Sequence, residues 1–297
     1  ELDVWAPMPR STTGEIVHYG RLAGLAGLPQ PWPLDLTPYD LRGFVYRSTP
    51  DDGTTAAGFE PRWSFGLDAT LRLGSSLALT AALNPDFGQI EADELVLNLS
   101  TIETWYGEKR PFFLADGDLF DTPLELFHTR RIGAVPAPPD VPDGWLLDRR
   151  PGEARIWEAL KLGGELAPGW TIGAVSALTG EETVGSIGPA GERADRVAAP
   201  LSHFAVLRLR HDFGGDNAVG LLATAVNRFE PGMYAGELCP SGRSPREGRC
   251  YSDAYVAAVD GNFRTEDGDW AGAAQAALTA LVGGPSRSLA DGTSLDA

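Results

Sequence analysis

The sequence lacks the features that define several common protein classes. It contains no run of about 18 apolar residues, which excludes a transmembrane helix. It contains no basic run and has a formal net charge of −17, which excludes nucleic acid as a partner, because binding to the phosphate backbone needs clustered Lys and Arg. It begins with neither an initiating Met nor a signal peptide, so we expect the chain to be part of a longer protein.

Familiar catalytic patterns are also missing. The chain has no nucleophile elbow, no phosphate-binding loop and no zinc-ligand spacing. Its four histidines are isolated from one another in sequence. No cofactor is therefore expected, and any chemistry has to come from residues that the fold brings together.

Only two cysteines occur, and both fall in one connection rich in Gly, Pro and Ser. Their spacing predicts a disulfide between Cys239 and Cys250, which would close a small loop in an oxidising compartment. The alternative is two free thiols in a mobile loop.

What the sequence does contain is alternation of apolar and polar residues with a period of two, which indicates β-strands. In one such segment Trp63, Phe65 and Leu67 alternate with Ser64, Gly66 and Asp68. Most of these segments are about ten residues long, which suits a tilted strand that crosses a bilayer. The predicted strands cover residues 34–47, 61–72, 76–84, 155–166, 170–179, 203–212, 217–228, 254–264 and 270–282.

Short and long connections alternate between these strands. The short turns contain RLGSS, LAPGW, DFGGDN and TEDGD, and the long connections cover about 48–60, 85–154, 180–202 and 229–253. This order is typical of an up-and-down barrel in an outer membrane, with tight periplasmic turns and long external loops. We therefore predict an all-β fold: an antiparallel up-and-down transmembrane β-barrel in a bacterial outer membrane, with outer-membrane lipid as partner. Residues 1–297 would form part of one barrel domain, incomplete at both ends; the alternative is a water-soluble β-protein.

The two faces of this barrel follow from the same alternation. Trp63, Phe65, Leu67, Leu207 and Leu209 are expected to face lipid. The opposite face would line a polar lumen and carry Asp68, Arg208, Asp260 and Arg264.

The longest connection, residues 85–154, is a charged insertion of about 70 residues, too long for a passive loop. It is expected to plug the lumen or to cap the surface. Its candidate catalytic carboxylates are Asp86, Glu91, Asp93, Glu103 and Glu108, which could act in pairs as acid and base on a saccharide. Its candidate substrate-binding or plug residues are Lys109, Arg110, Phe112, Phe113, His128, Arg130 and Arg131.

Each of these residues also has a structural interpretation. Asp86, Glu91 and Asp93 could bind a divalent cation, although their spacing matches no EF-hand loop, so the metal is unknown. Glu108 and Arg110 could instead form an ion-pair network that holds the plug in place. The aromatic rings could stack on sugars or could pack the insertion against the wall.

The strings LNPDFGQIEADELVLNLSTIETWYGEKRPFF and LFHTRRIG resemble the signature of a bacterial domain-of-unknown-function family. Members of that family often follow a module similar to family-nine carbohydrate-binding domains and are sometimes named membrane-associated hydrolases. The similarity is densest over residues 61–133. The chain departs from the family pattern at Gly107, Ala115 and His128, where Pro, Glu and Tyr are usual.

The resemblance implies an outer-membrane β-barrel but no particular chemistry. Two functions are therefore considered, the first from the pattern of connections and the second mainly from the name given to members of the family. In the first, the barrel serves surface binding or transport, is linked to a glycan ligand, and carries a charged plug at residues 85–131. In the second, it is a membrane-associated hydrolase that cleaves saccharides through a carboxylate pair in the same segment.

Overall fold

The computed structural model describes residues 32–47, 58–86, 106–214, 217–230, 239, 243–246 and 248–285. The chain divides into two compact units, Glu1–Pro33 and Leu34–Ala297. Nearly all of the described residues belong to the second unit.

The second unit is built on one nine-stranded antiparallel sheet, with strand order β1-β2-β3-β5-β6-β9-β10-β12-β13. In the described residues β1 and β13 each pair with a single strand, so the sheet is not closed there. The prediction of an all-β, antiparallel, meandering fold is confirmed, and all nine predicted strands are present. Their bounds are β1 Leu34–Arg47, β2 Gly58–Leu73, β3 Leu77–Leu83, β5 Ile156–Ala167, β6 Trp170–Thr179, β9 Leu201–Gly214, β10 Asn217–Phe229, β12 Asp253–Arg264 and β13 Ala271–Val282.

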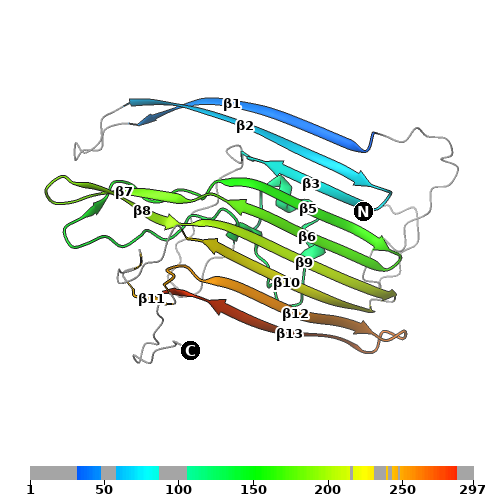
Figure 1. The fold of residues 1–297 in the computed structure, drawn as a ribbon. Coiled ribbons are helices and arrows are strands. Elements are labelled where there is room, and N and C mark those ends of the chain that lie inside the picture. Colours follow the sequence, from blue (N-terminus) through cyan, green and yellow to red (C-terminus); the bar gives the residue numbers. More distant parts are fainter. Residues whose placement is uncertain are drawn as a thin grey trace, which may run out of the picture. The chain divides into compact units, whose positions relative to one another are not determined.

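The connections separate by length to the two ends of the sheet. The short turns after β2, β5, β9 and β12 lie at the right of Figure 1, and β7 and β8, which belong to a long connection, lie at the left. Antiparallel neighbours joined in sequence order require this arrangement, because each strand returns along the one before it.

The long connections hold elements that the sequence analysis did not expect. A three-stranded sheet consists of β4 Leu146–Leu147, β7 Glu182–Ile187 and β8 Arg193–Ala199. A two-stranded sheet consists of β11 Pro245–Arg246 and β14 Gly284–Pro285. The insertion contains the short helix α1 Pro111–Leu114 and two 3-10 turns, η2 Gly117–Phe120 and η3 Thr129–Arg131. Most of these elements are too short to show a period.

The two predicted sets of side chains lie on opposite faces of the sheet. Along the register, Asp68 shares a face with Ala82 and Arg208, whereas Leu67 and Leu207 lie on the other face. Trp63, Phe65 and Leu207 are exposed, while Arg208 and Asp260 are buried. We call the face that carries Arg208 the inner face and the other the outer face.

One irregularity in the predicted alternation has a structural cause. The β5–β6 register shifts between Ile156 and Glu158, so Ile156 shares the inner face with Thr179, while Glu158 lies with Leu160 on the outer face. Such a β-bulge adds one residue to a strand and displaces the alternation that follows.

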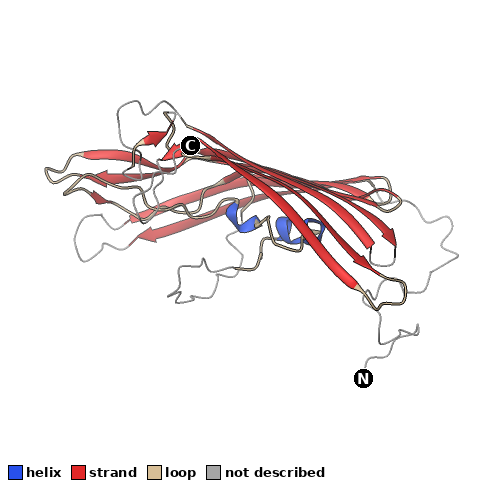
Figure 2. Ribbon diagram, turned by 90° about the horizontal axis from the view of Figure 1, so that it is seen from below, coloured by secondary structure: helices blue, strands red, loops and turns tan. Residues whose placement is uncertain are grey.

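The hydrophobic core lies between the inner face and the insertion. Phe113, Phe120 and Ile132 of the insertion pack with buried side chains of five strands, among them Ala177 and Leu222. Figure 2 shows the helical turns of the insertion on one side of the sheet. Among the described residues, no helix has the length and apolarity needed to cross a membrane.

The structure joins Cys239 and Cys250 in a disulfide. Both cysteines are buried, and the connection that contains them pairs through β11 with β14, which follows β13. Arg249 next to this disulfide binds the carboxylates of Glu230 and Asp253. The disulfide closes a loop within the β10–β12 connection, and the β11–β14 pairing and Arg249 tie this connection to the sheet.

Candidate functional site

The insertion leaves the sheet at Asn84, which has a left-handed backbone with φ of 49°. Asn tolerates this conformation better than most residues. Its side-chain amide donates to Ser64 Oγ at 3.1 Å and its Oδ1 accepts from Arg155 Nε at 2.7 Å. Its backbone carbonyl accepts a bond from the Tyr39 hydroxyl at 3.2 Å. Asn84 thus fixes the point at which the charged segment departs from β3.

Arg110 holds the two motif-bearing segments of the insertion together. Its Nη1 donates to the Ile132 carbonyl at 2.6 Å, and its Nη2 donates to the Thr129 carbonyl at 2.7 Å. Its Nε and Nη2 also bind the two carboxylate oxygens of Glu108 at 2.9 and 2.7 Å. The guanidinium lies 4.3 Å from the centre of the Phe113 ring. The motifs EKRPFF and HTRRIG therefore meet at one buried arginine.

Glu108 is ionised when it is paired with Arg110. Burial alone would raise its pKa, but hydrogen bonds from the side chains of Arg110 and Thr129, from the Arg110 backbone, and the charge of Arg110 lower the pKa to about 2. A carboxyl group that stays ionised to so low a pH is a poor general acid near neutral pH. Its structural role is to neutralise Arg110.

The lowered pKa of Glu108 predicts how the stability of the folded protein depends on pH in acid. Because the folded pKa is depressed below the usual 4.5, the stabilisation is present above about pH 4.5 and is lost as the pH falls toward 2. The shift corresponds to about 3 kcal/mol. Urea unfolding of the full-length protein in detergent micelles should therefore show wild type losing about that much more stability between pH 5 and 2 than Glu108→Gln, which cannot titrate. Equal losses in the two proteins would contradict the pairing.

The wall of the sheet holds the insertion through Lys161 of β5. The Lys161 side chain is only 3% exposed. Its Nζ donates to the Phe112 carbonyl at 2.6 Å and also to the Ala115 carbonyl, so it binds the unpaired carbonyls at the end of α1. The same ammonium group lies 5.2 Å from the centre of the Phe112 ring.

A pair of inward-facing glycines gives the insertion a second contact with the wall. Gly163 and Gly173 are register partners on β5 and β6. A Cβ on Gly163 would come within 2.8 Å of Leu119, and one on Gly173 within 3.0 Å of the Phe120 ring. The absence of side chains here lets η2 approach the sheet closely.

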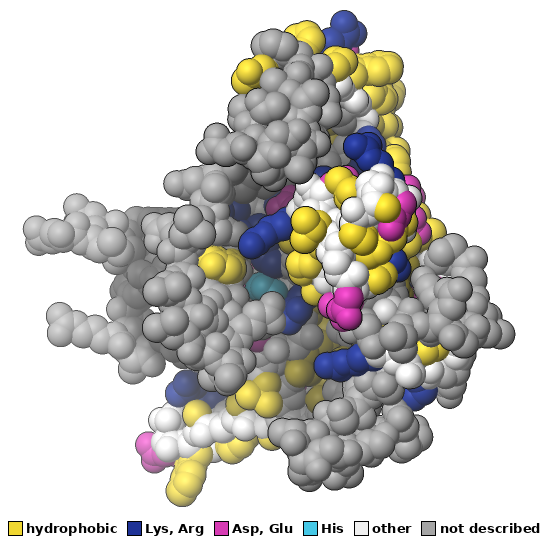
Figure 3. Space-filling model, turned by 90° about the vertical axis from the view of Figure 1, so that its left-hand side faces the viewer, with side chains coloured by type: hydrophobic (Ala, Val, Ile, Leu, Met, Phe, Trp, Pro, Cys, Tyr) yellow, Lys and Arg dark blue, Asp and Glu magenta, His cyan; other side chains and the backbone are white. Residues whose placement is uncertain are grey.

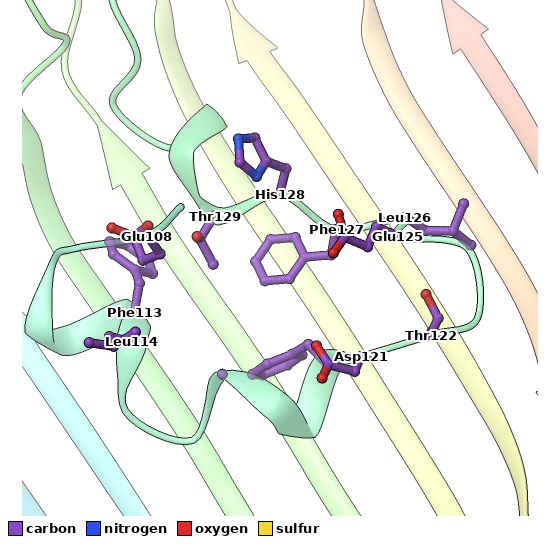
Figure 4. Close-up of a pocket in the computed structure, with 12 residues that line it drawn as sticks. Glu108, Phe113, Leu114, Asp121, Thr122, Glu125, Leu126, Phe127, His128 and Thr129 are labelled. Atoms are coloured by element: carbon purple, nitrogen blue, oxygen red, sulfur yellow. The ribbon is translucent and has the colours of Figure 1, made fainter. Parts of the chain in front are cut away.

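A cavity of about 190 Å³ lies within the insertion. In Figure 4 Glu108 and Thr129 lie side by side at one wall, Asp121 and Thr122 lie at another, and the Phe127 ring stands between them. Burial, followed by the charges of Asp118 and Glu125, raises the pKa of Asp121, while Arg208 acts in the opposite direction. The full lining consists of Glu108, Phe113, Leu114, Gly117, Phe120, Asp121, Thr122, Glu125, Leu126, Phe127, His128 and Thr129.

The sheet beneath the insertion carries a buried ion pair that crosses three strands. Arg208 of β9 binds both carboxylate oxygens of Asp260 on β12, and its Nη2 lies 2.8 Å from Oδ1. The pair passes over Gly220 of β10, where any Cβ would overlap the guanidinium. Figure 3, viewed from the end with the long connections, shows basic side chains gathered around the centre.

Some predicted site residues lie apart from this centre. Asp86 follows the end of β3, where its backbone N–H donates to the Tyr39 hydroxyl at 3.3 Å. Glu91, Asp93 and Glu103 lie outside the described residues, so their pairing with Asp86 or with a cation stays a prediction. In the described ranges, no three His, Cys, Asp or Glu residues are grouped so that they could hold a metal ion.

The basic and aromatic candidates lie within the insertion. Lys109, Arg130 and His128 are half-buried and Arg131 is exposed, and His128 lines the cavity. Phe112 and Phe113 meet edge to face, with ring centres 4.9 Å apart. Phe113 is almost wholly buried, so it packs the insertion and is not available to stack on a sugar.

Four sheet residues that hold the insertion were not among the predicted site residues: Lys161, Gly163, Gly173, and Gln275, whose side chain bonds to the Leu124 backbone. The only signal for Lys161 is a charged residue at an inward position of an apolar strand. Arg208 and Asp260 were predicted to face inward, but nothing in the sequence shows that they pair.

The model of a protein family described as a domain of unknown function, DUF5916, matches residues 30–235. The chain belongs to this family. The resemblance inferred from the NPDFGQ and EKRPFF motifs is thereby confirmed at the level of a domain-of-unknown-function family. No curated protein and no solved structure matches the chain.

The matched range of this family contains the whole insertion and the strands β1 to β10. It therefore includes Arg110, Lys161 and Arg208, whereas Asp260 and Gln275 lie beyond it.

Proposed function

We propose that the chain forms part of an outer-membrane β-barrel for surface binding or transport, in which the insertion constricts the lumen. The observation that carries this proposal is a single register row that crosses all nine strands on the outer face. Every residue in that row is Leu or Ala: Leu34, Leu71, Leu79, Leu162, Ala174, Leu207, Ala223, Ala257 and Leu278.

The adjacent row on the inner face has a different composition. It carries Asp35, Thr70, Thr80, Lys161 and Thr224, with valines beneath the insertion. An apolar outer face and a polar inner face are the pattern of a barrel in lipid, the reverse of a soluble barrel. A soluble sheet would expose the whole Leu and Ala row to water.

Exposed aromatic residues flank the aliphatic row at both ends of the strands. Aromatic girdles of this kind mark the two interfaces of a membrane. At the end with the short turns the exposed aromatics are Trp170, Phe213, Phe263 and Trp270. At the other end they are Phe44, Tyr46, Trp63, Phe229 and Tyr255.

Contacts of the insertion favour a plug over a catalytic site. Glu108 is fully engaged by Arg110, and Lys161 is engaged by backbone carbonyls. A glycosidase needs two carboxyl groups free to act on substrate. We therefore propose a constriction that surrounds a solute path, with a glycan as the expected class of ligand and bacterial outer-membrane lipid as its surroundings.

The test is extraction of the full-length protein from the outer membrane, followed by conductance and glycan-hydrolysis assays on one preparation. We expect the protein in the outer-membrane fraction and ion conductance after reconstitution into a planar bilayer. Recovery in the soluble fraction would overturn the proposal. Glycan hydrolysis that is lost in Glu108→Gln would favour the hydrolase instead.

A charge placed on the outer face gives a sharper prediction. Leu207→Arg puts a cation at mid-strand, where burial in the bilayer centre costs about 2–4 kcal/mol. Phe229→Arg puts the same charge near a rim, where the expected cost is about 0–1 kcal/mol. Urea-dependent folding into lipid vesicles should separate the two variants. Both side chains are exposed in the folded chain, so neither substitution removes core packing. If Leu207→Arg is as stable as Phe229→Arg, the outer face does not meet lipid.

A further inference from the structure

One segment of the insertion bridges the sheet from β6 to the edge strand β13. We call residues 121–127 the strap. It leaves the wall after Phe120, whose ring packs over Gly173 of β6. At its middle, the backbone N–H of Leu124 donates to Gln275 Oε1 of β13 at 2.6 Å, and the Leu124 carbonyl accepts from Gln275 Nε2 at 3.3 Å.

The strap crosses the inner face from β6 to β13. Four interstrand spacings of about 4.8 Å separate β6 from β13, which is about 19 Å along the sheet. The four steps from Phe120 to Leu124 reach at most about 14 Å. The side chains of Phe120 and Gln275, which make the contacts at the two ends, cover the rest of the distance. It runs over the Arg208–Asp260 pair, since Asp121 is influenced by Arg208 and Gln275 is the register partner of Asp260.

The two parts of the insertion are held very unequally. The docked part, α1, η2 and η3, is fixed by buried Arg110, buried Lys161 and the rings on the glycine pair. In the strap Asp121, Pro123, Leu124 and Glu125 are exposed, and Leu124 is 66% exposed. The 190 Å³ cavity lies between the strap and the docked part. Only Leu126 and Phe127, at the far end of the strap, pack against the core, so residues 121–125 are the loosely held part.

We propose that the strap is the movable gate of the constriction and that the Gln275 carboxamide is its latch, while the docked part stays in place. Weakly packed segments with few buried contacts open at low free energy, whereas buried networks open only with the whole fold. Release at Gln275 would swing the strap away from β13 and widen the path over Arg208 and Asp260. This inference rests on the proposed function, because a gate has meaning only in a barrel with a solute path.

The test compares Gln275→Ala with Thr279→Ala in the full-length protein. Thr279 lies four residues along the same strand and on the same face. Amide hydrogen exchange should be about tenfold faster in the strap of Gln275→Ala, because both hydrogen bonds to Leu124 are lost, and unchanged in α1 and η3. Thr279→Ala should match wild type. Equal exchange in the strap of all three proteins overturns the latch.

Conductance in a phosphatidylcholine and phosphatidylglycerol bilayer then tests the gate. Gln275→Ala should carry more current than wild type, and the double variant Leu124→Cys/Gln275→Cys, oxidised to join the strap to β13, should carry less than Leu124→Cys alone. Faster exchange without a change in current would overturn the gate. Failure of wild type and every variant to insert into the bilayer would overturn the proposed function itself, whatever the exchange shows.

Discussion

Arg110→Ala should lower the stability of the full-length protein by about 3–5 kcal/mol, because it leaves the largely buried Glu108 carboxylate without its charged partner. The carbonyls of Thr129 and Ile132 also lose their donors. With the two motif segments no longer joined, the insertion should loosen, and ion conductance should rise. Thermal unfolding in detergent micelles and single-channel recording measure the two effects.

Two variants control for this result. Arg131→Ala removes an exposed cation from the same motif and should change stability by less than about 0.5 kcal/mol. The double variant Glu108→Gln/Arg110→Ala should recover part of the loss, because the stranded charge is gone. If Arg110→Ala leaves stability and conductance unchanged but abolishes turnover of a glycan, the proposed constriction is wrong and the hydrolase function is favoured.

Asp260→Ala should destabilise the protein by a similar amount, about 3–5 kcal/mol, because it strands the Arg208 guanidinium, which is only 2% exposed. Gly220→Val should also lower stability. Gly220 lies on β10, between the strands of Arg208 and Asp260, and a side chain there would overlap the Arg208 guanidinium. Both losses are measured by urea unfolding in micelles.

The Arg208–Asp260 pair can be isolated by a double-mutant cycle. In an Arg208→Met background, Asp260→Ala should cost far less than in wild type, because no buried cation is left unpaired. Ala218→Val on the same strand and face is the control for Gly220→Val. Additive losses from Arg208→Met and Asp260→Ala would show that the two side chains are not coupled.

The strands could be predicted from the sequence because their signal is local. In β2, β9 and β12 the alternation of apolar and polar residues specifies the strand and its two faces within about ten residues. Turn residues between β5 and β6 and between β9 and β10 specify which strands are neighbours. The alternation is interrupted in β5, where a bulge between Ile156 and Glu158 places Ile156 on the inner face.

The position of the insertion could not be predicted in this way. The sequence showed that residues 85–154 are charged and aromatic, but not that Arg110 meets Ile132 or that Lys161 reaches Phe112. β7 and β8 escaped notice because their alternation is brief and interrupted by glycine and charge.

By itself, then, the sequence determined the class of fold, the order of the strands and the residues that face each side, because a period of two is a property of the extended chain. Only the tertiary structure decided which charges pair and where the insertion rests. Arg208 reaches Asp260 across β10, Gly163 lies opposite Gly173, and Gln275 binds Leu124 from 151 residues away. Such contacts depend on strand register and sheet curvature, which arise from the packing of the whole sheet and leave no local pattern along the chain.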